Sequence, residues 1–300
     1  MRRHINYCVA IALGLSASAA TAAAQSATID TTVAIEENGT LSVSIYSGRV
    51  SVTAGSGSRV TIKGRADVED LNIRRRTNGV RVQLDHGMHN SRVDLDVTVP
   101  VGTRVALEGF TAEFSVRGVK GEATVETLSG PITVVGAVGK VTLESVSGHI
   151  EATDIKGDVT AESVNGRVTV RNVEGDVTAE SVSSNLTISG ASARSVRAET
   201  VSGALSYDGT IEPSGNYSFT THSGPLTLAV PANAGATVSL ETFNGTVDSD
   251  FPVTLESGAN RRAGESQFDF RIGDGRARIV LETFNGNIRI QRGASRANRE

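Results

Sequence analysis

Apolar and polar side chains alternate along most of this chain, and the alternation returns in units of nearly constant length. In residues 141–144 the apolar Val141 and Leu143 enclose Thr142, and Glu144 follows. A period of two residues is typical of a β-strand that buries one of its faces. Short strands of this kind, separated by glycine-containing turns, predict an all-β protein.

The repeated unit is a run of five residues that begins in most copies with Glu and ends with Ser-Gly or Asn-Gly. Four copies follow one another at a spacing of 18 residues: Glu126-Thr-Leu-Ser-Gly130, Glu144-Ser-Val-Ser-Gly148, Glu162-Ser-Val-Asn-Gly166 and Glu180-Ser-Val-Ser-Ser184. With small insertions the register extends to residues 108–112, 199–203, 220–224, 241–245 and 282–286, and an early copy aligns through residues 41–48. Such repeats indicate stacked coils, each contacting only its neighbours.

The apolar positions of the aligned units form columns that we expect to point inward. The first strand of each unit contributes two columns, Val105, Ala123, Val141, Val159, Val177, Val196, Tyr217, Val238 and Ile279, then Leu107, Val125, Leu143, Ala161, Ala179, Ala198, Phe219, Leu240 and Leu281. After the turn, a second strand is expected to bury Ile132, Ile150, Val168, Leu186, Leu205, Leu226, Val247 and Ile288.

A third apolar column lies just before the turn, and we expect it to plug the corner between the two strands. Glycine is predicted at this turn because a reversing chain adopts positive φ, which glycine accepts without a Cβ clash. A second corner is expected at Gly121, Gly139, Gly157 and Gly175. The members of the third column are Phe110, Leu128, Val146, Val164, Val182, Val201, His222, Phe243 and Phe284.

These columns predict a β-solenoid, similar to a parallel β-helix, with coils of about 18–21 residues and Ser-Gly or Asn-Gly turns. Antiparallel hairpins in an up-and-down sandwich use the same turns and are the competing geometry. The near identity of successive units favours the solenoid, because stacking like on like turns each column into a ladder along the axis.

The two ends of the chain differ from the repeats. Residues 1–24 combine a basic start, a short apolar core and the Ala22-Ala-Ala24 site, which predicts a signal peptide and an exported protein. One solenoid domain is expected over residues 25–292, with less regular stretches at 67–92 and 251–276, followed by a flexible basic tail at 293–300. No integral membrane segment is expected after cleavage, because no later run reaches about 20 apolar residues.

Composition and charge narrow the function classes. The only cysteine, Cys8, leaves with the signal peptide, which removes disulfides and thiol chemistry. Cleavage also removes Arg2 and Arg3, so the formal net charge falls from −4 to −6. This acidic balance argues against a nucleic-acid partner. The 32 Gly residues and the absence of Trp fit a thin core that is repeated many times.

The most unusual surface feature is a column of glutamates, which we call the glutamate ladder. Carboxylates stacked about 5 Å apart repel by roughly 1 kcal/mol per pair in water. The ladder is interpreted as a solvated edge that blocks lateral aggregation, or as a row of weak Ca²⁺ contacts, or as a docking strip for a basic partner. Its members are Glu108, Glu126, Glu144, Glu162, Glu180, Glu199, Glu241 and Glu282.

The sequence offers no catalytic constellation, so no catalytic residue, metal ligand or bound cofactor is predicted. His86 and His89 flank a glycine-containing loop beside Asp85 but lack further ligands nearby, and His149 and His222 are interpreted as structural. Outward Asp94 and Asp96 do not form the pair of carboxylates in a cleft that glycoside hydrolysis requires. Motifs for a nucleophile elbow, a zinc protease or a phosphate loop are missing. The threonine columns, such as Thr124, Thr142, Thr160 and Thr178 and Thr133, Thr169 and Thr187, fit half-exposed strand positions, although hydroxyl arrays also contact sugars.

Three segments carry a resemblance to a known family. They are Leu95-Asp-Val-Thr-Val-Pro-Val-Gly102, Leu226-Thr-Leu-Ala-Val-Pro-Ala-Asn-Ala-Gly235 and Gly273-Asp-Gly-Arg-Ala-Arg-Ile-Val-Leu-Glu-Thr-Phe-Asn-Gly286. The chain resembles, over roughly residues 28–292, the bacterial putative-adhesin family of β-strand-repeat proteins, a domain of unknown function related to the head domain of putative autotransporter adhesins. The resemblance implies a β-repeat fold and a location outside the cytoplasm, periplasmic or at the cell surface.

The function predicted from these observations is that of a non-catalytic adhesin or envelope scaffold that acts by surface recognition. A cell-surface glycan or an envelope protein is the expected partner, with the ladder faces and the stretches 67–92 and 251–276 as contact elements. Two alternatives remain, a polysaccharide-processing β-helix enzyme and an accessory of envelope stress or assembly that has a protein partner.

Overall fold

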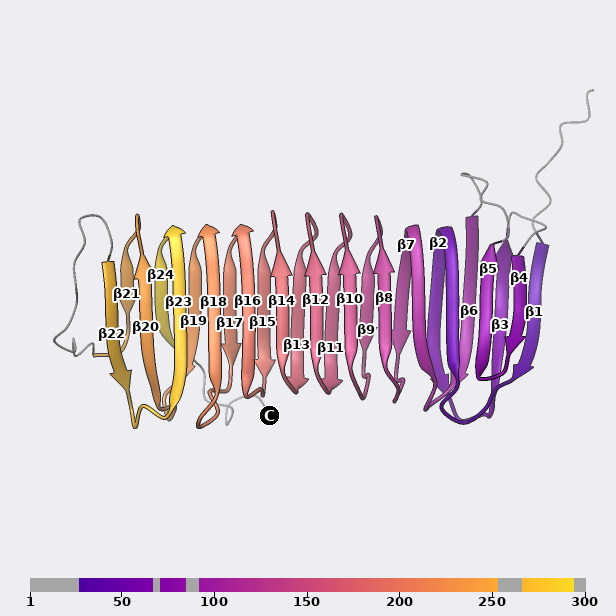
Figure 1. Ribbon diagram of the computed structural model, residues 1–300, viewed down its shortest axis with the longest axis horizontal. Coiled ribbons are helices and arrows are strands. Elements are labelled where there is room, and N and C mark those ends of the chain that lie inside the picture. The colour runs from indigo at the N-terminus through magenta and orange to yellow at the C-terminus, as the bar shows by residue number, and fades with distance from the viewer. Residues whose placement is uncertain (1–26, 67–70, 85–91, 253–265, 294–300) are drawn as a thin grey trace, which may run out of the picture.

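The computed structural model describes residues 27–66, 71–84, 92–252 and 266–293. The predicted signal peptide at 1–24, the loop with Asp85, His86 and His89, and residues 294–300 of the predicted tail lie outside the described residues. Within the described part every regular element is a β-strand, and the strands stand side by side along a rod, with β22 at one end and β1 at the other (Figure 1).

Two faces of paired strands form the rod, and each coil contributes one strand to each face. The first face has the order β4 (Leu71–Arg76), β5 (Gly79–Leu84), the first half of β2 (Thr40–Gly55), the first half of β7 (Arg104–Arg117), β8 (Ala123–Thr127), β10 (Val141–Ser145), β12 (Val159–Ser163), β14 (Val177–Ser181), β16 (Ser195–Ser202), β18 (Asn216–Ser223), β23 (Ala277–Asn285), β20 (Ala236–Thr242) and β22 (Ser266–Ile272).

The second face uses the remaining strands. Its order is β1 (Ala27–Ala34), β3 (Arg59–Ala66), β6 (Arg92–Pro100), the second halves of β2 and β7, β9 (Ile132–Val135), β11 (Ile150–Lys156), β13 (Val168–Glu174), β15 (Leu186–Ala191), β17 (Leu205–Gly209), β19 (Leu226–Pro231), β24 (Ile288–Gly293) and β21 (Val247–Ser249).

From β7 to β19 all pairings are parallel, and they keep one register apart from a bulge between β15 and β17 at Ser189 to Ala191, which confirms the predicted solenoid. Val141 pairs with Ala123 on one side and Val159 on the other, and Glu144 pairs with Glu126 and Glu162. Antiparallel strands are confined to the two ends, where β4 and β22 close the first face. The competing sandwich of hairpins is therefore wrong for the body of the rod.

The core is one thin layer between the two faces. Both predicted columns of the first strand are buried, and so is the column of the second strand apart from the half-buried Val247 on the short end strand β21. Where Ala161, Ala179 and Ala198 give way to Phe219, the column becomes aromatic, and Phe219 packs against Tyr207 with ring centroids 5.0 Å apart. The buried Tyr207 hydroxyl donates to the carbonyl of Thr210 at 2.8 Å, which satisfies its polar end.

The predicted corner plug is wrong, because the third apolar column points outward. Val146 is 38% exposed and Phe284 50%, whereas the preceding residues Ser145 and Thr283 are buried. The Gly148 N–H donates to Ser145 Oγ at 2.8 Å, and Gly166 N–H donates to Ser163 Oγ at 2.9 Å. These bonds hold the hydroxyls inside the corner, so the next side chain on an alternating strand must face out.

The turn positions of Gly148 and Gly166 require glycine because the coils pack closely there, and not because the backbone adopts positive φ. A Cβ on Gly148 would lie 1.7 Å from the carbonyl oxygen of Gly130, and one on Gly166 would lie 1.8 Å from that of Gly148. Positive φ is found at Gly130 (143°), but not at Gly148 or Gly166. Gly148 and Gly166 are glycines because the backbone of each coil rests on the turn of the coil before it, whereas Ala112 and Ser184 occupy the same column in two other coils.

The final coil does not stack at the end of the rod. Strand β23 pairs with β18 on one side and with β20 on the other, so residues 277–285 lie between coils that precede them in the sequence. At the other end β2 lies between β7 on one side and β5 and β6 on the other, so it lies between strands that follow it in the sequence. Within the stretch 67–92, which was expected to be less regular than the coils, residues 71–84 form the antiparallel hairpin of β4 and β5.

Candidate functional site

A long groove follows the corner at the end of the first-face strands. One wall is the glutamate ladder, the floor is the column of buried hydroxyls such as Ser145 and Ser163, and the other wall is the outward apolar column. The groove has a volume of about 1120 Å³. All eight predicted ladder residues line it: Glu108, Glu126, Glu144, Glu162, Glu180, Glu199, Glu241 and Glu282.

In-register pairing fixes the order of the ladder. Consecutive carboxylates from Glu108 to Glu199 occupy neighbouring rungs, which are about 4.8 Å apart in a parallel sheet. Thr220 takes the next rung, and Glu282 follows it before Glu241 because β23 lies inside β20. Nine rungs thus form one row, of which eight carry a carboxylate.

The ladder raises the pKa of some of its own members. Partial burial raises the pKa of Glu126, and the charges of Glu144 and Glu108 raise it further. The pKa of Glu162 is raised in the same way by burial and then by Glu180 and Glu144. The carboxylates therefore repel one another along the groove, and a cation beside them would relieve this repulsion.

One arginine offsets the ladder locally. Arg197 occupies the outward position that is threonine in the preceding coils, and its guanidinium pairs with Glu199 and lies 3.9 Å from Glu180. Among the residues that the structure describes, no other cation contacts the ladder. The ladder carboxylates without a paired cation are thus Glu108, Glu126, Glu144 and Glu162 on one side of Arg197, and Glu282 and Glu241 on the other.

The apolar wall, which we call the apolar ladder, becomes aromatic at both ends. Tyr46 stacks on Phe110 with centroids 4.9 Å apart, beyond the first groove rung. At the far end Phe284 stacks between His222, at 5.0 Å, and Phe243, at 4.9 Å. His222 is therefore an exposed member of this stack. The apolar ladder runs Tyr46, Phe110, Leu128, Val146, Val164, Val182, Val201, His222, Phe284 and Phe243.

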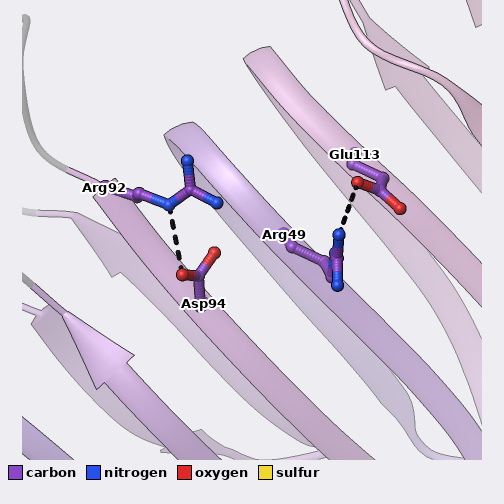
Figure 2. A network of polar contacts seen from close by, with 4 residues as sticks. All are labelled: Arg49, Arg92, Asp94 and Glu113. Carbon is purple, nitrogen blue, oxygen red and sulfur yellow. Dashed lines mark hydrogen bonds and ion pairs between the residues drawn. The ribbon is translucent and has the colours of Figure 1, made fainter.

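The other sequence candidates lie away from the groove. Asp94 sits on β6 and pairs with Arg92 at 3.1 Å, and Arg49 of β2 pairs with Glu113 of β7 at the same distance (Figure 2). These are exposed ion pairs of the second face. His149 accepts a hydrogen bond from the backbone N–H of Arg167 at 3.2 Å. The threonines of the first face are half-buried on their strands.

The described ranges contain neither a metal cluster nor a membrane-spanning helix. No group of three or more His, Cys, Asp or Glu side chains there is arranged to hold a metal ion. The same part of the chain contains no helix that is long and apolar enough to cross a bilayer.

The apolar ladder was identified from sequence as a column, but its role as a groove wall was missed.

The chain is similar to solved structures and to one protein family. A solved structure from Clostridium sporogenes, described as a putative cell adhesion protein, aligns with a TM-score of 0.25 at 10% identity, covering 89% of this chain and 100% of the other. One from Bacteroides fragilis, described as a putative adhesin, aligns with a TM-score of 0.40 at 11% identity, covering 88% and 97%. No curated protein matches. The family model described as Toastrack DUF4097 matches residues 21–291, which confirms the predicted resemblance to a domain of unknown function. The chain belongs to the Toastrack DUF4097 family.

Proposed function

We propose that this protein is an exported, non-catalytic, adhesin-like rod that recognises a partner along its groove. The observation that carries the proposal is the continuous pairing of two unlike ladders, carboxylates on one wall and exposed apolar side chains on the other. Exposed apolar surface gathered in one place is typical of interaction sites. The basic and apolar start of the chain supports export.

Recognition explains the ladder better than turnover does. An acid–base pair needs two carboxylates in unlike surroundings, so that one holds a proton and the other does not. Here the carboxylates repeat in one register, and the pKa shifts of Glu126 and Glu162 share the same causes. A repeated surface of this kind offers many equivalent contacts to one long partner.

Binding of the purified protein tests the proposal. Residues 25–300 are assayed on glycan arrays, on whole cells and on envelope fractions, with and without Ca²⁺. The variant E126Q/E144Q/E162Q/E180Q removes four groove charges, and E113Q/E122Q/E151Q/E174Q removes four acids outside the groove as a matched control. We expect binding that the groove variant loses and the control keeps. Equal binding by both variants, or release of products from any glycan, would overturn the proposal.

The same experiment tests whether Ca²⁺ assists binding along the glutamate ladder. If weak Ca²⁺ contacts along the ladder assist recognition, binding rises with Ca²⁺ for the unaltered protein and not for the groove variant. An increase of equal size in both proteins would place the Ca²⁺ effect outside the groove.

A further inference from the structure

The exposed apolar side chains of this protein are concentrated in a single column. Nine large hydrophobic side chains of the described residues are exposed, and all except Val138 belong to the apolar ladder. The exposed fractions of the eight side chains in the apolar ladder range from 38% for Leu128 to 50% for Phe284. A row of this length is an unpartnered surface, and its neighbour across the groove determines which partner suits it.

The neighbouring wall requires a cationic partner. Glu108, Glu126, Glu144 and Glu162 follow one another without a paired cation, and burial together with mutual repulsion raises the pKa of two of them. A second copy of the groove would bring further carboxylates to this surface, which adds repulsion. A partner with Lys or Arg beside apolar side chains matches both walls.

The rung spacing favours a helix over an extended chain. Side chains on one side of a β-strand recur about every 6.8 Å, whereas the rungs recur about every 4.8 Å. An α-helix lying along the rod presents a side chain of one stripe about every 5.4 Å, so its mismatch per contact is far smaller. The flexible stems of Lys and Arg absorb a difference of this size.

The aromatic stacks argue against a sugar chain on the apolar wall. The rings of Phe284 and Phe243 are inclined by only 2°, and those of Phe284 and His222 by 5°. Each ring thus covers the face of its neighbour and presents its edge to the groove. Apolar helix side chains pack against ring edges, but the stacking of a sugar needs an open ring face.

We infer that the groove binds a basic amphipathic α-helix of a protein partner, lying along the rod axis with its Lys and Arg stripe on the glutamate ladder. This inference rests on the proposed function and names the partner class of the same groove. Nine rungs span roughly 38 Å, which corresponds to a helix of about 25 residues. Basic residues belong over Glu108 to Glu162, and bulky apolar ones over His222, Phe284 and Phe243.

The test uses a labelled synthetic helix of 25 residues with adjacent Lys and Leu stripes. Three peptide controls are a scrambled sequence of the same composition, a version with two central prolines, and a version with every Lys replaced by Glu. Binding to residues 25–300 is followed by fluorescence anisotropy. Helix formation is followed by circular dichroism at 222 nm, as the difference between the spectrum of the mixture and the sum of the spectra of the protein and the peptide alone.

The amphipathic helix is expected to bind and gain helicity, and each control peptide to bind at least tenfold more weakly. E126Q/E144Q/E162Q and, separately, V146T/V164T/V182T should each weaken binding at least tenfold, while E113Q/E122Q/E151Q/E174Q does not. Thermal unfolding of each variant shows that it is folded. Equal binding of the scrambled or proline peptide, or no binding of the helix, overturns the inference. If whole-cell binding still depends on the ladder in that case, the proposed function stands and only the partner class is wrong.

Discussion

Phe243 and Phe284 stack with their ring centroids 4.9 Å apart, and the later residue lies nearer the centre of the rod. Both belong to the same sequence, Leu-Glu-Thr-Phe-Asn-Gly, which occurs at 240–245 and again at 281–286. Strand β23 can occupy an inner rung because its inward residues Ile279 and Leu281 align with the inward apolar residues of β18 and β20. The C-terminal coil is therefore a structural layer of the rod and not its cap.

The inner position of β23 predicts how the end of the rod unfolds. Leu281→Ala should lower the free energy of unfolding by about 2–5 kcal/mol, since Leu281 is fully buried between β18 and β20. Amide hydrogen exchange measured by mass spectrometry should speed up in residues 236–242 as well as in 277–285. Faster exchange confined to 277–285 would show that β20 does not depend on β23.

The contact between Gly148 and the coil below predicts that this turn does not accept a methyl group. Gly148→Ala should destabilise the protein by more than about 2 kcal/mol, because the added Cβ would lie 1.7 Å from the Gly130 carbonyl oxygen. Gly57→Ala is the control, since the nearest atom to its Cβ would be 4.0 Å away. Urea denaturation compares the two, and equal midpoints would contradict the explanation.

The hydroxyl column predicts unequal effects at residues of the same type. Ser163→Ala removes the acceptor of the Gly166 N–H, so about 1–2 kcal/mol should be lost. Ser181 occupies the same column, but its buried hydroxyl has no hydrogen-bond partner. Ser181→Ala should therefore be neutral or slightly stabilising. Thermal unfolding of the two variants measures the difference, and a larger loss for Ser181→Ala would refute this account.

The ladder predicts a dependence of stability on pH. The folded-state pKa values of Glu126 and Glu162 lie above the ordinary value of 4.5. In the pH window just above 4.5, the folded protein therefore binds more protons than the unfolded protein does. Their contribution to stability is therefore lost as pH rises through this window. E126Q/E162Q should raise the unfolding temperature at pH 7, with a gain in the free energy of unfolding of less than about 1 kcal/mol per site because the groups are largely exposed. At pH 3 the gain should vanish, and a gain that persists there would rule out charge repulsion.

Much of the fold was predictable because each coil repeats one alternating pattern. Val141 and Leu143 were expected inside and Glu144 outside, and the structure confirms all three. The position of Val146 was not predictable from hydrophobicity, because the hydrogen bond from Gly148 to Ser145 decides which of two neighbours turns inward. A serine three residues before a turn glycine was the available signal.

The order of the last coils was also beyond the sequence pattern. Residues 236–245 and 277–286 carry equivalent columns, so either order satisfies the same contacts and chain order alone favours the wrong one. The structure places the predicted glutamates on neighbouring rungs of one row. Its pairing with the apolar ladder was missed for the same reason as the position of Val146.

The constant 18-residue coil between β8 and β14 gives this protein a simple way to change its reach. Duplication of residues 141–158 would insert one more coil with the same columns at both junctions, because Lys140 and Asp158 each precede a valine of the first column. Every such copy adds one carboxylate and one apolar side chain to the groove walls and lengthens the rod by about 4.8 Å. The strands at the two ends of the rod stay the same. The length of the groove is thus set by the number of coils, and it changes in whole multiples of one 18-residue segment.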